Sequence, residues 1–158
     1  MYGKLEDMVR EWTCRKRALF DGVLMGDAVD VYRDGMQLVQ RIEDELKMLQ
    51  DQIGPATSHV SQSPSNHMGE HSDPTSKVIE RIDDLEYLLS DLNRDIGCVR
   101  QQIVAGINSD IKNRDHKYIF YHHCILGQPY KQIAKELMLS ESHCRSVISK
   151  YRKFYAGE

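Results

Sequence analysis

Apolar residues between positions 78 and 103 recur at steps that alternate strictly between four and three. The positions are Val78, Ile82, Leu85, Leu89, Leu92, Ile96, Val99 and Ile103. Such a pattern is the heptad seam of a coiled coil, because a straight helix drifts away from a strict seven-residue repeat. An earlier segment has the same rhythm, at Val39, Ile42, Leu46, Leu49 and Ile53. The two segments predict long helices, each of which buries one apolar stripe.

Residues 54–75 separate the two heptad segments and differ from both in composition. They are rich in Ser, His, Asn, Pro and Gly and poor in apolar side chains, which predicts a flexible linker. The run Asp73-Pro74-Thr75-Ser76 predicts the start of the second long helix, with Asp or Ser as its N-cap. A linker of this length can span either helix. The sequence therefore leaves open an antiparallel hairpin within one chain and a homodimer through the heptad segments.

Charged side chains flank both the second heptad helix and the N-terminal segment. The outer face of the heptad helix carries Glu80, Arg81, Asp83, Asp84, Glu86, Arg94, Asp95 and Arg100, which we interpret as a solvated face. In the first thirty residues an amphipathic helix is predicted by Leu5, Met8, Val9, Trp12, Leu19 and Val23. Gly22 and Gly26 are expected to mark its end or a hinge. We interpret the basic run Arg15-Lys16-Arg17 as solvated too.

The stretch from Tyr130 to Tyr151 has the pattern of two short helices joined by a tight turn. Ile133, Ala134 and Leu137 form the apolar face of the first helix, and Met138-Leu139 is expected to form the turn. Ser140 stands at an N-cap position. The second helix is expected to face inward with Cys144, Val147, Tyr151 and Phe154. It would face outward with Glu141, Ser142, His143, Arg145, Ser146, Ser149, Lys150 and Lys153.

A supporting helix is predicted just before this pair, from about Asn113 to Leu126. Gly127 is a stop signal, and Pro129 restarts the chain as a helix. The packing face of this supporting helix is predicted to consist of Tyr118, Tyr121, His122 and Ile125. The sequence thus predicts an all-α protein in which long coiled-coil helices precede a C-terminal three-helix head. Its expected parts are N-terminal helices with the first heptad segment (1–53), a linker (54–75), a coiled-coil helix (76–109) and a helix-turn-helix domain (110–158).

Charge is distributed unevenly along the chain. Residues 110–158 contain nine Lys and Arg against five Asp and Glu, whereas the preceding residues contain twelve against nineteen. A basic C-terminal part can hold phosphates while the acidic part keeps the protein in solution. The formal net charge of −3 hides this separation.

The C-terminal pattern resembles region 4 of bacterial sigma factors and sigma-like regulators. The resemblance lies in the run from Ile125 to Ser140, ILGQPYKQIAKELMLS, which is similar to the family pattern G-x-S-x-x-E-I-A-x-x-L-x-x-S. Pro129 departs from it, because Ser or Thr usually stands at that cap. With its heptad segments, the chain also resembles phage and prophage late-gene activators of the ArpU and RinA type. The resemblance implies a phage-encoded DNA-binding regulator, an activator that binds double-stranded DNA, with the coiled-coil part supplying either dimerisation or a contact with host RNA polymerase. Because the sequence has neither a membrane-spanning run nor the pattern of a signal peptide, we expect the protein in the cytoplasm of the bacterial host.

Individual residues can be assigned roles on this helix-turn-helix interpretation. Base edges are expected to meet Ser142, His143, Arg145 and Ser146, because the first two turns of a recognition helix reach deepest. Phosphates are expected to meet Lys150, Arg152 and Lys153. The resemblance adds Gln128, Tyr130 and Lys131 as further phosphate contacts.

Other functional classes are disfavoured by the sequence. There is no G-x-x-x-x-G-K-[ST], H-E-x-x-H or G-x-S-x-G motif, so we do not expect an enzyme or a cofactor. The four cysteines form no C-x-x-C pair, and we expect no metal at His122-His123-Cys124 and His143-Cys144. No apolar run is long enough for a membrane span. Two alternatives stay open: a protein-interaction module that binds host RNA polymerase or another host protein, and a small terminase subunit, which usually carries its helix-turn-helix earlier in the chain.

Overall fold

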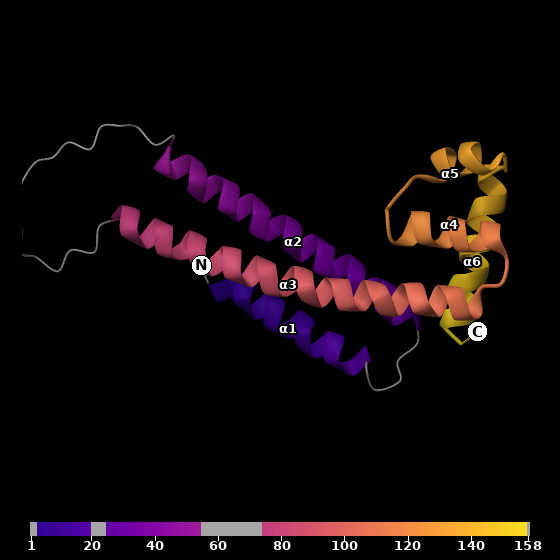
Figure 1. Ribbon diagram of the computed structural model, residues 1–158, viewed down its shortest axis with the longest axis horizontal. Coiled ribbons are helices and arrows are strands. Elements are labelled where there is room, and N and C mark those ends of the chain that lie inside the picture. Colours follow the sequence, from indigo (N-terminus) through magenta and orange to yellow (C-terminus); the bar gives the residue numbers. More distant parts are fainter. Residues whose placement is uncertain (1–2, 20–24, 55–73, 158) are drawn as a thin grey trace, which may run out of the picture.

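The computed structural model describes residues 3–19, 25–54 and 74–157. Within them the chain is all-α, as predicted, without a β-strand. The helices are α1 (Gly3–Leu19), α2 (Met25–Ile53), α3 (Pro74–Asp110), α4 (Arg114–Cys124), α5 (Tyr130–Leu137) and α6 (Glu141–Tyr155). In Figure 1, α1, α2 and α3 lie side by side as an elongated stalk, and α4, α5 and α6 gather as a head at the end of α3. None of the described helices is both long enough and apolar enough to cross a membrane.

The stalk is built on an antiparallel pair formed by α2 and α3 (Figure 1). The heptad positions of α3 from Leu92 to Ile103 are buried, and so are those of α2 from Val39 to Leu49. At the end away from the head Val78 is only partly buried, and Ile53 is 41% exposed. The two predicted seams are therefore paired within one chain, which is one of the two arrangements that the sequence left open.

The ends of the long helices differ in part from the predicted boundaries. α3 begins at Pro74 and runs to Asp110, and α1 ends at Leu19. Gly26 belongs to the first turn of α2, where a Cβ atom would lie 3.6 Å from Cβ of Tyr155. Gly22, Val23, Asp73 and most of the predicted linker (55–73) lie outside the described residues.

Trp12 joins α1 to the stalk at a point where α2 has no side chain. Its indole Nε1 donates a hydrogen bond to the backbone carbonyl of Val31, with an N–O distance of 2.7 Å. A Cβ atom at Gly35 would lie only 2.9 Å from Trp12 Cζ2 and 3.0 Å from Ile96 Cγ1. Gly35 therefore allows the closest approach of the three stalk helices, because any larger residue would meet two buried side chains.

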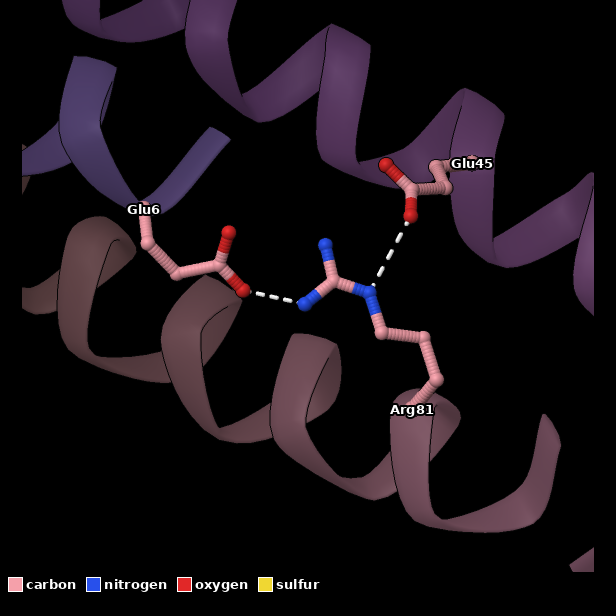
Figure 2. A network of polar contacts seen from close by, with 3 residues as sticks. All are labelled: Glu6, Glu45 and Arg81. Atoms are coloured by element: carbon pink, nitrogen blue, oxygen red, sulfur yellow. Dashed lines mark hydrogen bonds and ion pairs between the residues drawn. The ribbon is translucent and has the colours of Figure 1, made fainter. Parts of the chain in front are cut away.

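Arg81 links all three stalk helices through two carboxylates (Figure 2). Its guanidinium contacts Glu6 on α1 and donates through Nε to Glu45 Oε1 on α2 at 3.2 Å. The side chain of Arg81 is only 11% exposed, so its assignment to a solvated face was wrong. Burial opposes the ionisation of Glu6, but the hydrogen bond and charge of Arg81 outweigh it and lower the pKa of that carboxyl.

The N-terminal basic run is also tied to the stalk. Arg15 pairs with Asp34 on α2 at 2.6 Å, and Lys16 pairs with Asp95 on α3 at 3.0 Å. The Lys16 side chain is mostly buried in this pair, whereas Arg15 remains half exposed. The prediction of a solvated run therefore fails at Lys16, and at Asp95 on the predicted outer face of α3. The burial of these side chains depends on partners in other helices, and the periodicity of a single helix does not reveal those partners.

The head packs around the rear of α6. Asn113 caps α4 by accepting hydrogen bonds from the backbone N–H groups of Asp115 and His116. Gly127 follows with a φ of 68°, as a helix stop signal requires. The buried side chains are Ile119, Phe120 and Cys124 of α4, Ile133 and Ala134 of α5, and Cys144, Val147, Ile148, Tyr151 and Tyr155 of α6.

Two predicted packing faces in the head were partly wrong. On α4, Ile119, Phe120 and Cys124 form the core, while Tyr118 and Tyr121 are only partly buried. On α6, Phe154 is 57% exposed, and its neighbour Tyr155 is buried in its place. A helix of about 3.6 residues per turn moves off a strict three-and-four alternation, and by the last turn the stalk-facing position has shifted by one residue.

Candidate nucleic-acid interface

Three residues set the two ends of α5 and the start of α6. Pro129 stands at the N-cap of α5 with ψ 149°, so the chain leaves Gly127 extended and enters the helix with a fixed φ. Met138 ends α5 in the left-handed region, with a φ of 55°. Ser140 Oγ then accepts a hydrogen bond from the backbone N–H of His143 at 3.1 Å, which confirms the predicted N-cap.

α6 has one buried side and one open side. Successive residues turn by about 100° around a helix. The middle of the open side is therefore opposite Cys144, Val147 and Tyr151, and it carries Ser142, Ser146, Ser149 and Lys153, all of which are exposed. α6 contacts α2 through its C-terminal end, where Tyr155 lies against Gly26. Within the described residues the stalk thus leaves this row uncovered.

Ser149 belongs to the open row but was not among the predicted base-edge contacts. The prediction stopped at the second turn of α6 because only the first two turns of a recognition helix were considered. The spacing of Ser142, Ser146 and Ser149, at steps of four and three, was the signal that placed Ser149 beside the other two. The row is a strip of hydroxyl groups, each of which can donate and accept a hydrogen bond.

Arg145 lies on the flank of α6 that faces α5. Its guanidinium stands over the ring of Tyr130 at 5.5 Å, and Tyr130 stacks on His123 with ring centroids 4.0 Å apart. Arg145 also lies 3.7 Å from Glu141, and 66% of its side chain is exposed. This flank brings together two predicted contacts, Arg145 and Tyr130. The exposed Lys131 follows directly in α5.

His143 and Lys150 lie on the opposite flank, which faces α4. The rings of His143 and His116 are 6.1 Å apart, and the ammonium of Lys150 is 5.5 Å from the ring centroid of Tyr151. His116 Nδ1 is 3.0 Å from the hydroxyl of Tyr151. His143 therefore stands to one side of the hydroxyl row rather than on its midline. His116 was not identified by the sequence, because nothing in the spacing brings the first turn of α4 to α6.

Gln128 is used in the connection between α4 and α5. Its side-chain oxygen is 2.9 Å from His122 Nδ1, and its backbone carbonyl is 3.0 Å from His123 Nδ1. Its backbone N–H donates to the carbonyl of His122 at 2.9 Å. Gln128 thus positions the start of α5, and its amide nitrogen is the part of the side chain that can still reach a phosphate.

Arg152 is not brought together with the other predicted contacts. It lines a cavity of about 510 Å³ between α2, α4 and α6, together with Asp27, Asp30, Arg33 and Cys124. Burial raises the pKa of the Cys124 thiol, although Arg152 and Arg33 act in the other direction. Arg152 therefore faces the stalk, while Lys153 belongs to the open row.

A second hollow lies on another side of the head. It has a volume of about 570 Å³ and separates α3 from α4 and α5. Its apolar lining comes from Val104, Ile107, Tyr118, Tyr121 and Leu137. Tyr118 and Tyr121, which were predicted to form a packing face, line this hollow instead.

Comparisons with known proteins do not assign the chain to a family. No family model matches the sequence, and neither a curated protein nor a solved structure is significantly similar to it.

Proposed function

We propose that this protein is a sequence-specific DNA-binding regulator of transcription, in which α5 and α6 act as a helix-turn-helix. The observation that carries the proposal is the open side of α6. A row of hydroxyl groups and one lysine lies on a helix whose rear is fully packed, at the end of an elongated stalk. A single exposed helix with hydrogen-bonding side chains is the element that enters the major groove of a duplex.

The side chains of α6 divide by position into two roles. Ser142, Ser146 and Ser149 would meet base edges, and Arg145 would form a bidentate contact with guanine. Such a contact contributes about 1–3 kcal/mol of discrimination. Lys153, at the end of the hydroxyl row, and Lys131, on the neighbouring α5, would bind backbone phosphates and position the helix.

The stalk is proposed to act in recruitment. The resemblance to phage late-gene activators makes the activation of phage genes in a bacterial cytoplasm the favoured role. On this proposal the head holds the promoter, and the stalk contacts host RNA polymerase.

The proposal is tested by measuring duplex binding across a salt series. Duplexes are first selected from a random pool with the full chain, and their affinity is then measured by fluorescence anisotropy. We expect Arg145→Ala with Lys150→Ala to weaken binding and to flatten the dependence of log K on log salt. The matched control is Lys47→Ala with Arg94→Ala, which removes the same charge from exposed stalk positions. Absence of binding at low salt, or an equal loss in the control, contradicts the proposal.

A second function is favoured by the apolar hollow between α3, α4 and α5. On this alternative the protein is an interaction module that binds a host protein, such as RNA polymerase, through the side chains around Val104 and Leu137. Val104→Lys would then abolish binding of purified bacterial polymerase and leave duplex affinity intact. Polymerase binding without any duplex affinity would favour this function over the first.

A further inference from the structure

The first turns of α4 and α6 place two histidines beside a lysine. The ring of Tyr151 stands at the centre of this group: His116 Nδ1 is 3.0 Å from its hydroxyl, and Lys150 Nζ is 5.5 Å from its ring centroid. His143 lies next to His116, with ring centroids 6.1 Å apart. His143 and Lys150 are exposed, and His116 is partly buried. We call His116, His143 and Lys150 the histidine flank of α6.

The histidine flank collects positive charge with little to neutralise it. Burial is the main cause that lowers the pKa of His116, and the charges of Lys150 and His143 lower it further. Asp115 is the acidic group that acts in the opposite direction. Since Tyr151 engages Nδ1 of His116, Nε2 is the ring atom that can meet a ligand. Among the described residues, the positive groups of the histidine flank therefore outnumber the acidic groups that act on it.

The two flanks of α6 lie on either side of the open row. One flank carries Arg145 over Tyr130, on the side of α5, and the other is the histidine flank, on the side of α4. A helix in the major groove has one phosphate backbone on each side of it. We propose that the histidine flank binds a phosphodiester of the DNA strand opposite to the one that α5 faces, and that it takes up protons as it binds. This inference rests on the proposed DNA-binding function and adds the second strand to it.

The sign of the pH dependence follows from the charge of the ligand. A phosphodiester favours the protonated form of a histidine, so binding raises the pKa of His116 above its value in the free protein. The affinity therefore increases as the pH falls, by up to about tenfold per pH unit for each proton taken up. Because the pKa of free His116 is lowered from its usual value, the increase is expected to continue below the pH at which an ordinary histidine is half protonated.

The first measurement compares duplex affinity near pH 7.5 and pH 5.5 at constant salt. We expect the full chain to bind a short random-sequence duplex about tenfold more tightly at the lower pH. His116→Gln and His143→Gln should each remove part of this gain, since glutamine retains hydrogen bonding but cannot become charged. A variant with His59→Gln, His67→Gln and His71→Gln is the control and should keep the whole gain.

The second measurement follows the imidazole C2 protons of the unmodified chain by NMR. Adding the duplex should raise the pKa of His116. If the duplex binds with unchanged affinity across this pH range, or if the pKa of His116 stays where it was, the inference is wrong and the proposed function stands. If inorganic phosphate at the same phosphate concentration raises the pKa of His116 as the duplex does, the flank is a free-anion site and the assignment to a DNA strand is overturned. A chain that binds no duplex at any pH refutes the proposed function as well.

Discussion

Substitution of Gly35 by alanine tests whether the contact of Trp12 with α2 holds the stalk together. The new Cβ atom would lie 2.9 Å from Trp12 Cζ2, 3.0 Å from Trp12 Cε2 and 3.0 Å from Ile96 Cγ1. All three distances are shorter than ordinary van der Waals contacts between carbon atoms. Neither neighbour can move freely, since Trp12 is 2% exposed and Ile96 is 4% exposed.

Two opposing effects decide the sign of the change. Replacing glycine by alanine inside a helix stabilises it by about 1 kcal/mol. Overpacking a tight core costs about 1–3 kcal/mol, and moving the indole would also weaken its hydrogen bond to Val31, whose net contribution is about 1 kcal/mol. We therefore expect Gly35→Ala to lower the free energy of unfolding by about 1–3 kcal/mol. For a chain of this size that is about 2–4 °C of Tm for each kcal/mol.

The control is the same substitution at Gly97, in the middle of α3. A Cβ atom at Gly97 meets no atom within 4 Å, so only the gain in helix propensity remains. Gly97→Ala should raise the free energy of unfolding, while Gly35→Ala should lower it, when both are measured by urea denaturation monitored by circular dichroism. In a Trp12→Leu background the cost of Gly35→Ala should be smaller, because the ring that meets the new methyl group is gone. Equal stabilisation by both alanines would refute the packing of α1 on α2 described above.

Three further predictions concern a charge, a cap and a turn. Arg81→Met leaves Glu6 and Glu45 without their shared partner and should cost about 1–3 kcal/mol at pH 7 in urea denaturation. In the unmodified protein the lowered pKa of Glu6 contributes stability at every pH above the pKa that Glu6 has in the unfolded chain, and this contribution is lost on acidification. The difference in the free energy of unfolding between Arg81→Met and the unmodified protein should therefore shrink towards pH 4. Ser140→Ala removes the cap of α6 and should lower the free energy of unfolding by about 1 kcal/mol, with Ser140→Asp as the variant that restores it. Met138→Gly should instead stabilise the head by about 0.5–1 kcal/mol, as measured by thermal denaturation, because Met138 is 93% exposed and held at a φ of 55°.

Local signals predicted much of the helical framework. The alternation of four and three from Val78 to Ile103 identified the buried stripe of α3, because burial along one helix depends on its own periodicity. Ser140 and Gly127 were also predictable, since a cap and a left-handed stop depend on the residue type and on its immediate neighbours. Each of these features is decided within about one turn of the chain.

Features that depend on a neighbouring helix were not predictable in the same way. The partners of Arg81 are separated from it by 75 and 36 positions in the sequence, and the pattern of α3 alone made it look solvated. His116 and His143 become neighbours only when α4 crosses α6. The burial of Tyr155 in place of Phe154 also involves a neighbouring helix, because Tyr155 is the residue that lies close to Gly26 at the start of α2.

The acidic stalk is compatible with a head that binds DNA, because salt limits the range of its charge. The residues before position 110 carry nineteen Asp and Glu against twelve Lys and Arg. α3 contains 37 residues, so at about 1.5 Å per residue the stalk extends some 55 Å from the head. The screening length at physiological ionic strength is about 8 Å, so charges along most of the stalk hardly reach a duplex on α6. Repulsion is then left to acidic groups next to the junction, such as Asp27 and Asp30, which line the same cavity as Arg33 of α2 and Arg152 of α6. Because Arg152 is exposed at this cavity, its charge can help to neutralise the end of the stalk that is closest to a duplex in the proposed complex.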